Sequence, residues 1–302
     1  MRNTAFVFSG QGSQYVGMGN DAVKIHPEAE QYYTKASEIL GFDLLDICRN
    51  GNEAALADTV VSQPAILLFS YLRCLAYRED HQPEPVFYAG HSLGEYTALL
   101  AAGVLEFEEA IRLIGKRAAC MKQCAEENKG TMIAVICEND DTEVLSLIRQ
   151  QRMNAEDSAV ISCVNSSRQI VLSGGIEQIS RMTEVLSRAN GVRVIPLHVS
   201  GAFHSPLMAD AAEMLSETLL HAEFHALPRC AGVISNVTGI PYTDTAQIRK
   251  ELCLQITHPV QWCRSVQYMA AHGADTFIEF GAKPTLSQLI KKEVSANAVP
   301  YI

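Results

Sequence analysis

The stretch "VFYAGHSLGEYTALLAAG", residues 86–103, restricts the fold most strongly, because it places a serine in a narrow turn. The apolar run before Gly90 is typical of a buried strand, and the residues after Gly94 are typical of a helix. Ser92 lies between these glycines in the pattern G-x-S-x-G, which exposes a serine hydroxyl as a nucleophile. The alternative is that Ser92 caps the helix beginning at Leu93. Both interpretations predict a strand, a tight turn and a helix here.

Short apolar strands alternate with helices on both sides of this turn. We expect strands at 4–8, 231–237 and 276–281, and helices at 62–79, 107–127, 245–255, 261–271 and 284–292. Such alternation predicts an α/β protein with a mostly parallel sheet that is covered by helices on both faces.

Residues 131–198 follow a different order: strand, helix, strand, strand, helix, strand. This is the order of a ferredoxin-like unit. We therefore expect a large α/β-hydrolase-like domain formed by residues 1–128 and 199–302, interrupted by a small ferredoxin-like subdomain at residues 129–198. A cleft between the two is the natural place for a ligand.

Composition excludes several classes of function. The net charge is −10, and no cluster of Lys and Arg offers a surface for nucleic acid or acidic lipid. The nine cysteines are never spaced C-x-x-C, so we expect neither a disulfide framework nor a zinc site. No apolar run approaches the roughly 18 residues of a membrane span, and the N-terminus is not typical of a signal peptide. We expect a cytoplasmic protein with no metal.

His204 is the best candidate among the nine histidines for a base that would activate Ser92. It lies in a loop after a predicted strand, and Ser205 and Pro206 are typical of the start of the helix that follows. The positive end of a helix favours the neutral imidazole that a general base requires. The alternative is a loop histidine whose hydrogen bonds are only local.

Arg117 lies on the apolar face of the helix predicted at 107–127, together with Ile114 and Met121. A guanidinium keeps its charge when it is buried, so it requires a carboxylate partner. An internal salt bridge would supply that carboxylate, and so would an acidic substrate.

The glycine-rich "SGQGSQ", residues 9–14, follows the first predicted strand. Its spacing fits neither G-x-G-x-x-G nor a phosphate-binding loop that ends in G-K-[ST]. It remains a turn at the carboxyl end of a strand, where the amide of Gln11 could face a site.

Several segments together resemble the malonyl-CoA:acyl carrier protein transacylases, in particular the free-standing acyltransferases that serve polyketide synthases in trans. The matching segments cover nearly the whole chain in order: 10–14 "GQGSQ", 90–95 "GHSLGE", Arg117, Asn165 in "VNSSRQIVLSGG", 201–205 "GAFHS", 235–239 "SNVTG" and 258–262 "HPVQW".

The resemblance implies a mechanism. Ser92 would attack the thioester of malonyl-CoA with His204 as base, and the malonyl group would pass to the phosphopantetheine thiol of an acyl carrier protein, in polyketide or fatty acid biosynthesis. Gln11 and the Leu93 N–H would stabilise the oxyanion, and Arg117 would bind the malonyl carboxylate. The resemblance assigns further substrate-binding positions to Met121, Asn165, Phe203 and Gln255. The enzyme would be a monomer without a cofactor.

Two of these residues have a specific implied role. The main-chain carbonyl of Gln255 would orient His204, and the ring of Phe203 would reject substrates with an α-methyl branch.

Two other functions compete with this one. An acyl hydrolase could use the same serine as a proofreading thioesterase, but Arg117 speaks against it because such enzymes act on acyl groups without a free carboxylate. The same hydrolase function in a lipase-like α/β-hydrolase requires an acid between the serine and the histidine, and the candidates Asp140, Asp141 and Asp157 fall in the ferredoxin-like segment. A non-catalytic module that docks carrier proteins would have no use for Ser92, His204 and Arg117.

Overall fold

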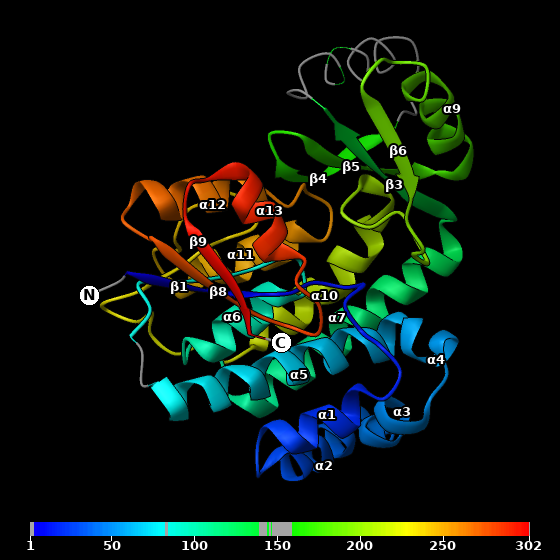
Figure 1. Ribbon diagram of the computed structural model, residues 1–302. Helices are drawn as coiled ribbons and strands as arrows, with labels where there is room; N and C mark the ends of the chain where they lie inside the picture. The colour runs from blue at the N-terminus through cyan, green and yellow to red at the C-terminus, as the bar shows by residue number, and fades with distance from the viewer. Residues whose placement is uncertain (1–2, 82–83, 139–143, 145, 147–158, 302) are drawn as a thin grey trace.

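The computed structural model describes residues 3–81, 84–138, 144, 146 and 159–301, and within them it contains two sheets (Figure 1). Sheet A is parallel, with the strand order β7-β2-β1-β8-β9. Its strands are β1 (Thr4–Phe8), β2 (Phe87–Gly90), β7 (Gly232–Val233), β8 (Thr276–Phe280) and β9 (Asn297–Tyr301). The central strands are almost wholly buried and apolar, as expected for a parallel sheet between helices.

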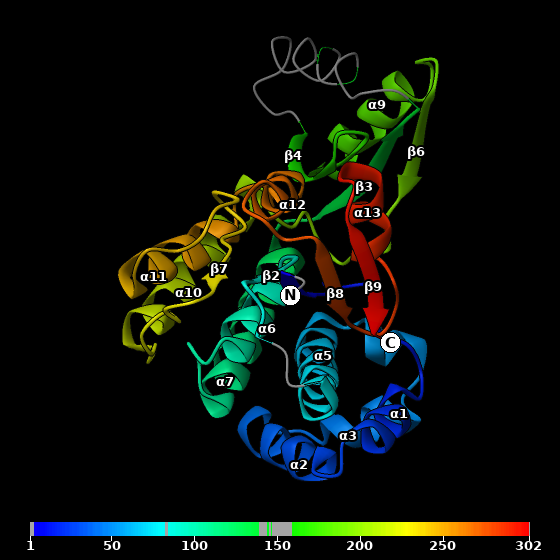
Figure 2. The ribbon, with the colours of Figure 1, turned by 60° about the vertical axis from the view of Figure 1, so that its left-hand side comes forward.

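Helices surround sheet A. They are α1 (Met18–Ile25), α2 (Ala29–Leu40), α3 (Leu44–Asn50), α4 (Glu53–Ala57), α5 (Thr59–His81), α6 (Gly94–Ala101), α7 (Phe107–Glu127), α10 (Ala209–His221), α11 (Thr245–Gln255), α12 (Trp262–Ala271) and α13 (Leu286–Glu293). Helix α6 packs on β1 and β2, and α13 packs on β8 and β9. Helices α1 and α2 lie beyond α5, on the side away from the sheet (Figures 1 and 2).

Sheet B is antiparallel, with the strand order β4-β5-β3-β6. Its elements are β3 (Gly130–Cys137), β4 (Val160–Ser166), β5 (Gln169–Gly175), α9 (Ile176–Leu186) and β6 (Val192–Pro196). Strands β3 and β5, the first and third strands of this segment, lie at the centre of the sheet, as in a ferredoxin-like unit. This arrangement confirms the predicted fold class. The helix expected near 141–152 falls almost entirely outside the described residues.

The two sheets have separate apolar cores. The core of sheet B includes Val135, Ile170, Leu172 and Leu186, and the main core is built on sheet A. The division of the chain into domains at residues 129 and 198 stays a prediction.

Helix α5 is long and apolar enough to cross a membrane by length and composition alone. However, 72% of its most apolar window is buried inside the protein, where the helix packs against α1, α6 and α7. Its apolar surface is therefore used in the core.

Several elements differ from the sequence prediction. Helix α5 begins at Thr59 rather than at 62, because the carbonyl of Asp58 already accepts hydrogen bonds from the N–H groups of Val61 and Ser62. The strand expected at 231–237 ends at Val233, after which the chain turns toward the Ser92 region. Helices α1 to α4 and strand β9 were not predicted.

Candidate active site

Ser92 lies at the turn between β2 and α6, with φ of 54°, one of two non-glycine residues with positive φ in the described part of the chain. The flanking glycines are required by the close packing of this turn. A Cβ added at Gly90 would overlap the carbonyl of Gly94, and one added at Gly94 would overlap the carbonyl of Phe8. Helix α6 begins at Gly94 without a side-chain cap, so Ser92 is not a helix cap and its hydroxyl is available for other contacts.

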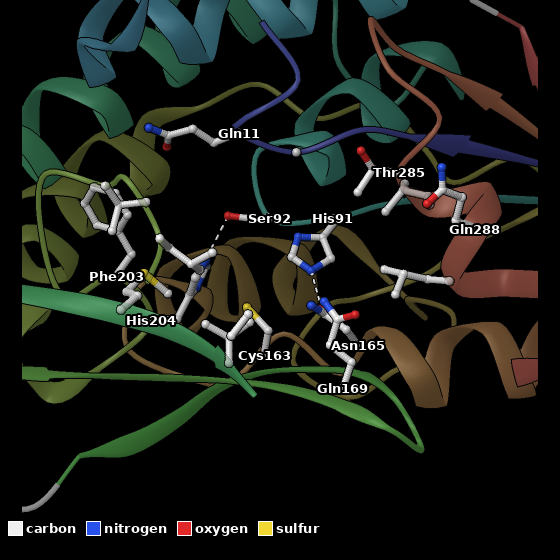
Figure 3. Close-up of a pocket in the computed structure, with 18 of the residues that line it drawn as sticks. Gln11, His91, Ser92, Cys163, Asn165, Gln169, Phe203, His204, Thr285 and Gln288 are labelled. Carbon is white, nitrogen blue, oxygen red and sulfur yellow. Dashed lines mark hydrogen bonds between the residues drawn. The ribbon is translucent and has the colours of Figure 1, made fainter. Parts of the chain in front are cut away.

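His204 is the other residue with positive φ, at 56°, and it directly contacts the serine. Its Nε2 lies 2.8 Å from Ser92 Oγ, and its Nδ1 donates to the main-chain carbonyl of Gln255 at 2.7 Å (Figure 3). The Nδ1–H bond leaves Nε2 as the acceptor that faces the serine. Burial, with a contribution from the Arg117 charge, lowers the pKa of His204 to about 3. The imidazole is therefore a neutral base.

Arg117 is 1% exposed and points at the same hydroxyl. Its Nη2 donates to Ser92 Oγ at 3.0 Å and to Gln255 Oε1 at 2.9 Å, and its Nη1 donates to Gln63 Oε1 at 2.7 Å. No carboxylate among the described residues forms an ion pair with Arg117, and its Nε makes no hydrogen bond. The internal salt bridge considered from the sequence is therefore absent from the described structure. A buried cation with no carboxylate in direct contact is costly, so this site is suited to an acidic ligand.

Ser92 lines a pocket of about 400 Å³, whose lining side chains are drawn in Figure 3. It is lined by six residues expected from the sequence: Gln11, Ser92, Met121, Asn165, Phe203 and His204. Leu93, Arg117 and Gln255 do not line the pocket; Arg117 contacts both the lining residue Ser92 and Gln255. Sheet B contributes Met132, Ala134, Cys163 and Val171, and α13 contributes Leu286, Leu289 and Lys292. The pocket therefore lies between the two sheets, where a cleft was expected.

Asn165 connects sheet B to the serine turn. Its Oδ1 accepts a hydrogen bond from His91 Nε2 at 2.9 Å, and burial lowers the pKa of His91. The neighbour of Ser92 is thus turned toward sheet B rather than toward the hydroxyl of Ser92.

Two groups near Ser92 are suited to an oxyanion. The N–H of Leu93 stands at the N-terminus of α6 and donates to no other group in the described part of the chain. Gln11 lies in the turn after β1 and lines the pocket, with its amide turned away from Ser92 Oγ in this structure (Figure 3). A helix N-terminus with a free N–H favours negative charge beside the serine.

Three residues that hold the site were not assigned from the sequence: Gln63, Glu95 and Asn236. Asn236 Oδ1 accepts a hydrogen bond from the Ser92 N–H at 2.7 Å, and its Nδ2 donates to the Gly90 carbonyl at 2.7 Å. The two hydrogen bonds fix the backbone of the serine turn. A carboxylate within the apolar run "GEYTALLAA" is the signal by which Glu95 could have been found.

Across the ranges that the structure describes, no three His, Cys, Asp or Glu side chains are grouped so that they could hold a metal ion.

Comparison with known proteins agrees with this geometry. The acyl transferase domain family matches residues 5–301. A malonyl CoA-acyl carrier protein transacylase from Bacillus subtilis is 37% identical over 296 residues, covering 97% of this chain and 72% of the relative. The polyketide biosynthesis protein ThaF from Burkholderia thailandensis is 36% identical over 294 residues, covering 97% of this chain and 24% of the relative.

The fold agrees as well. The structure resembles the malonyl-transacylase in a solved complex with a type II polyketide synthase acyl carrier protein, with a TM-score of 0.91 and 33% identity over 99% of this chain and 95% of that one. The family match, the relatives and the motifs around Ser92 and His204 lead to one conclusion: this chain belongs to the acyl transferase domain family.

Proposed function

We propose that this chain is a malonyl-CoA:acyl carrier protein S-malonyltransferase that works through a malonyl ester on Ser92. The observation that carries the proposal is Arg117, a buried cation without an ion-pair partner among the described residues, 3.0 Å from the hydroxyl that also contacts His204. The site therefore combines a nucleophile and a neutral base, which can form an acyl ester, with a cation that has no ion-pair partner. This combination suits an acyl group that ends in a carboxylate.

The first half of the reaction loads the serine. His204 Nε2 takes the proton from Ser92 Oγ as the oxygen attacks the thioester carbon of malonyl-CoA. The carbonyl oxygen becomes an oxyanion, which the Leu93 N–H and the Gln11 amide stabilise. The carbon–sulfur bond then breaks, His204 returns the proton to the sulfur, and coenzyme A leaves.

Arg117 is placed to hold the substrate during this step. In a malonyl ester only one methylene separates the ester carbonyl from the carboxylate, so a group in contact with Ser92 Oγ is within reach of both. The carboxylate would replace the hydroxyl as acceptor and form a charge-assisted, bidentate pair with the guanidinium. The buried charge would then be neutralised.

The second half transfers the malonyl group. The phosphopantetheine thiol of the carrier protein enters the pocket, loses its proton to His204 and attacks the ester carbon. The carbon–oxygen bond breaks and Ser92 regains its proton from His204. The apolar wall from sheet B, including Met132 and Val171, suits the pantetheine arm in both halves.

Phe203 and Met121 line the pocket near the reacting groups, and Phe203 is almost completely buried. A rigid ring at this place would reject an α-methyl branch by steric overlap, which makes malonyl the preferred unit. Asn165 supports the pocket from sheet B.

We also propose that the enzyme acts as a cytoplasmic monomer without a cofactor, since the chemistry requires only side chains of one chain. It would supply malonyl units to polyketide or fatty acid biosynthesis. A proofreading hydrolase would use the same serine and histidine, and the unpaired Arg117 favours the transferase.

Intact-protein mass spectrometry tests the proposal. Incubation with malonyl-CoA should add one malonyl group to the protein but not to Ser92→Ala, and a phosphopantetheinylated carrier protein should remove it. Rapid hydrolysis of the adduct without transfer would favour the hydrolase instead.

A further inference from the structure

Glu95 is a completely buried carboxylate in α6 that the proposed mechanism leaves unused. Its Oε1 accepts hydrogen bonds from the Asn236 main-chain N–H at 2.8 Å and the Tyr242 hydroxyl at 2.6 Å. Its Oε2 accepts from Gln255 Nε2 at 2.5 Å. All three partner groups donate a hydrogen bond, so both carboxylate oxygens of Glu95 act as acceptors.

The Gln255 amide lies between Glu95 and the reacting groups. Its Nε2 donates to Glu95 and also to the Ser92 main-chain carbonyl at 3.0 Å, and its Oε1 accepts from Arg117 Nη2 at 2.9 Å. Both ends of the amide are therefore fully used. The guanidinium has only donors, so it can be held by the oxygen end of the amide and not by the nitrogen end.

The two ends of an amide are nearly equal in shape, so hydrogen-bond partners decide its direction. A reversed Gln255 would set its NH₂ against the Arg117 donors and its oxygen against two acceptors, the Ser92 carbonyl and the Glu95 carboxylate. Glu95 is the acceptor that excludes this arrangement, because a carboxylate offers no proton that could satisfy the reversed amide.

We propose that Glu95 is a positioning residue that sets the direction of the Gln255 amide and so holds the Arg117 guanidinium toward Ser92 Oγ. This inference rests on the proposed role of Arg117 as the carboxylate-binding group. Glu95 does not line the pocket. It contacts Gln255, and its charge also acts directly on Arg117, so its effect should be confined to substrates that need Arg117.

The test is Glu95→Gln, assayed with malonyl-CoA and with acetyl-CoA, whose neutral acyl group does not require Arg117. The amide of the introduced glutamine can accept from the Asn236 N–H and the Tyr242 hydroxyl only if its oxygen faces them. Its NH₂ then faces the NH₂ of Gln255, and two donors in contact favour the reversed orientation of the Gln255 amide. Leaving such buried groups mispaired should lower kcat/KM for malonyl loading at least about 10-fold, with less than about 3-fold change for acetyl loading. Assays at about pH 8 keep the carboxylate ionised in the wild type, since burial raises the pKa of Glu95 to about 7.

Gln255→Met supplies a second route to the same answer, because it keeps the volume and removes the amide. Even if Glu95→Gln does not fold, Gln255→Met should lower malonyl loading more than acetyl loading, while the lost hydrogen bond to the Ser92 carbonyl lowers both. In the Gln255→Met background, Glu95→Gln should change the malonyl to acetyl ratio much less than it does in the wild type, because the contact between the two side chains is already lost.

Glu109→Gln is the matched control, since Glu109 is also a buried glutamate but contacts Arg112 and the Glu223 N–H, away from the pocket. It should leave the ratio unchanged. Equal losses for both substrates in Glu95→Gln, an additive effect in the Gln255→Met background, or no greater loss for malonyl than for acetyl in Gln255→Met would overturn the inference. A wild-type protein that fails to load malonyl would contradict the proposed function itself.

Discussion

At the scale of single residues, the Ser92 hydroxyl is the common contact of the candidate catalytic and carboxylate-binding groups. Ser92 Oγ faces His204 Nε2 and receives a hydrogen bond from Arg117, and both Ser92 and His204 adopt positive φ to reach this arrangement. Such backbone strain is typical of functional sites, where the surrounding structure maintains it. Burial is the main cause of the lowered pKa of His204, and the Arg117 charge that would bind a carboxylate lowers it further.

The pKa of His204 leads to a prediction about pH. A folded pKa of about 3, below the ordinary value of 6.5, means that the imidazole stays neutral and able to accept a proton as the pH falls. The kcat/KM for acetyl loading, which isolates the base from the carboxylate-binding group, should change less than about 2-fold between about pH 8 and pH 5. Stopped-flow release of coenzyme A measures it. A fall to half the maximum near pH 6.5 would show an ordinary histidine.

At the scale of elements, the site depends on a turn that has no room for side chains. Helix α7 was predicted correctly at 107–127, because a long amphipathic helix repeats its apolar face many times. Strands β7 and β9 are too short to show such a repeated pattern. Whether a short segment forms a strand depends on the strands beside it in the sheet, which the local sequence does not show. The serine turn was predictable because glycines at both flanks are a local steric requirement.

Gly90→Ala tests this requirement. The added methyl group would overlap the carbonyl of Gly94, so the turn must open and Ser92 must leave its contacts with His204. We expect a loss of stability of about 1–3 kcal/mol, measured by denaturant unfolding, and at least about 100-fold slower malonyl loading.

Gly41→Ala is the control for this change. Gly41 ends α2 with φ of 79°, but a Cβ there meets no atom within 4 Å. Its cost of about 1–2 kcal/mol comes from the backbone alone, and loading by the folded protein should be unaffected. Normal loading by Gly90→Ala would contradict the steric account of the turn.

At the scale of the whole molecule, the pocket exists only because sheet B is attached beside the end of sheet A. Strand β4 exchanges main-chain hydrogen bonds with Val260 just before α12, and the Ser167 N–H donates to Glu293 of α13 at 2.7 Å. Asn165 adds the contact with His91 at 2.9 Å. These contacts hold the wall of the pocket formed by sheet B against the wall formed by the serine turn and α13.

Asn165→Ala removes the side-chain part of this attachment. It leaves His91 Nε2 buried without its partner, which should cost about 1–3 kcal/mol and slow loading about 10-fold. Because the carboxylate-binding group is untouched, malonyl and acetyl loading should fall together, as steady-state kinetics with both substrates would show. A loss restricted to malonyl would mean that Asn165 contacts the carboxylate.

The same long-range organisation limits what the sequence can predict. Ser92, His204 and Arg117 each stand in a recognisable local pattern, so they could be selected before the structure was known. Gln63, Glu95 and Asn236 could not be assigned roles, because their contacts join elements far apart in the chain; Asn236 and Glu95 are separated by 141 positions. A hydrogen-bond partner at that distance has no local signal.

The central claim is that an unpaired, buried arginine selects an acyl group that ends in a carboxylate. The most direct measurement is kcat/KM for loading of Arg117→Ala with malonyl-CoA and with acetyl-CoA, with Arg112→Ala, on the same helix but paired with Glu109, as control. Loss of a buried charge-assisted pair should lower malonyl loading at least about 100-fold. Acetyl loading should change only slightly, and Arg112→Ala should behave as the wild type. Equal losses for both substrates in Arg117→Ala, or no loss for malonyl, would contradict the account.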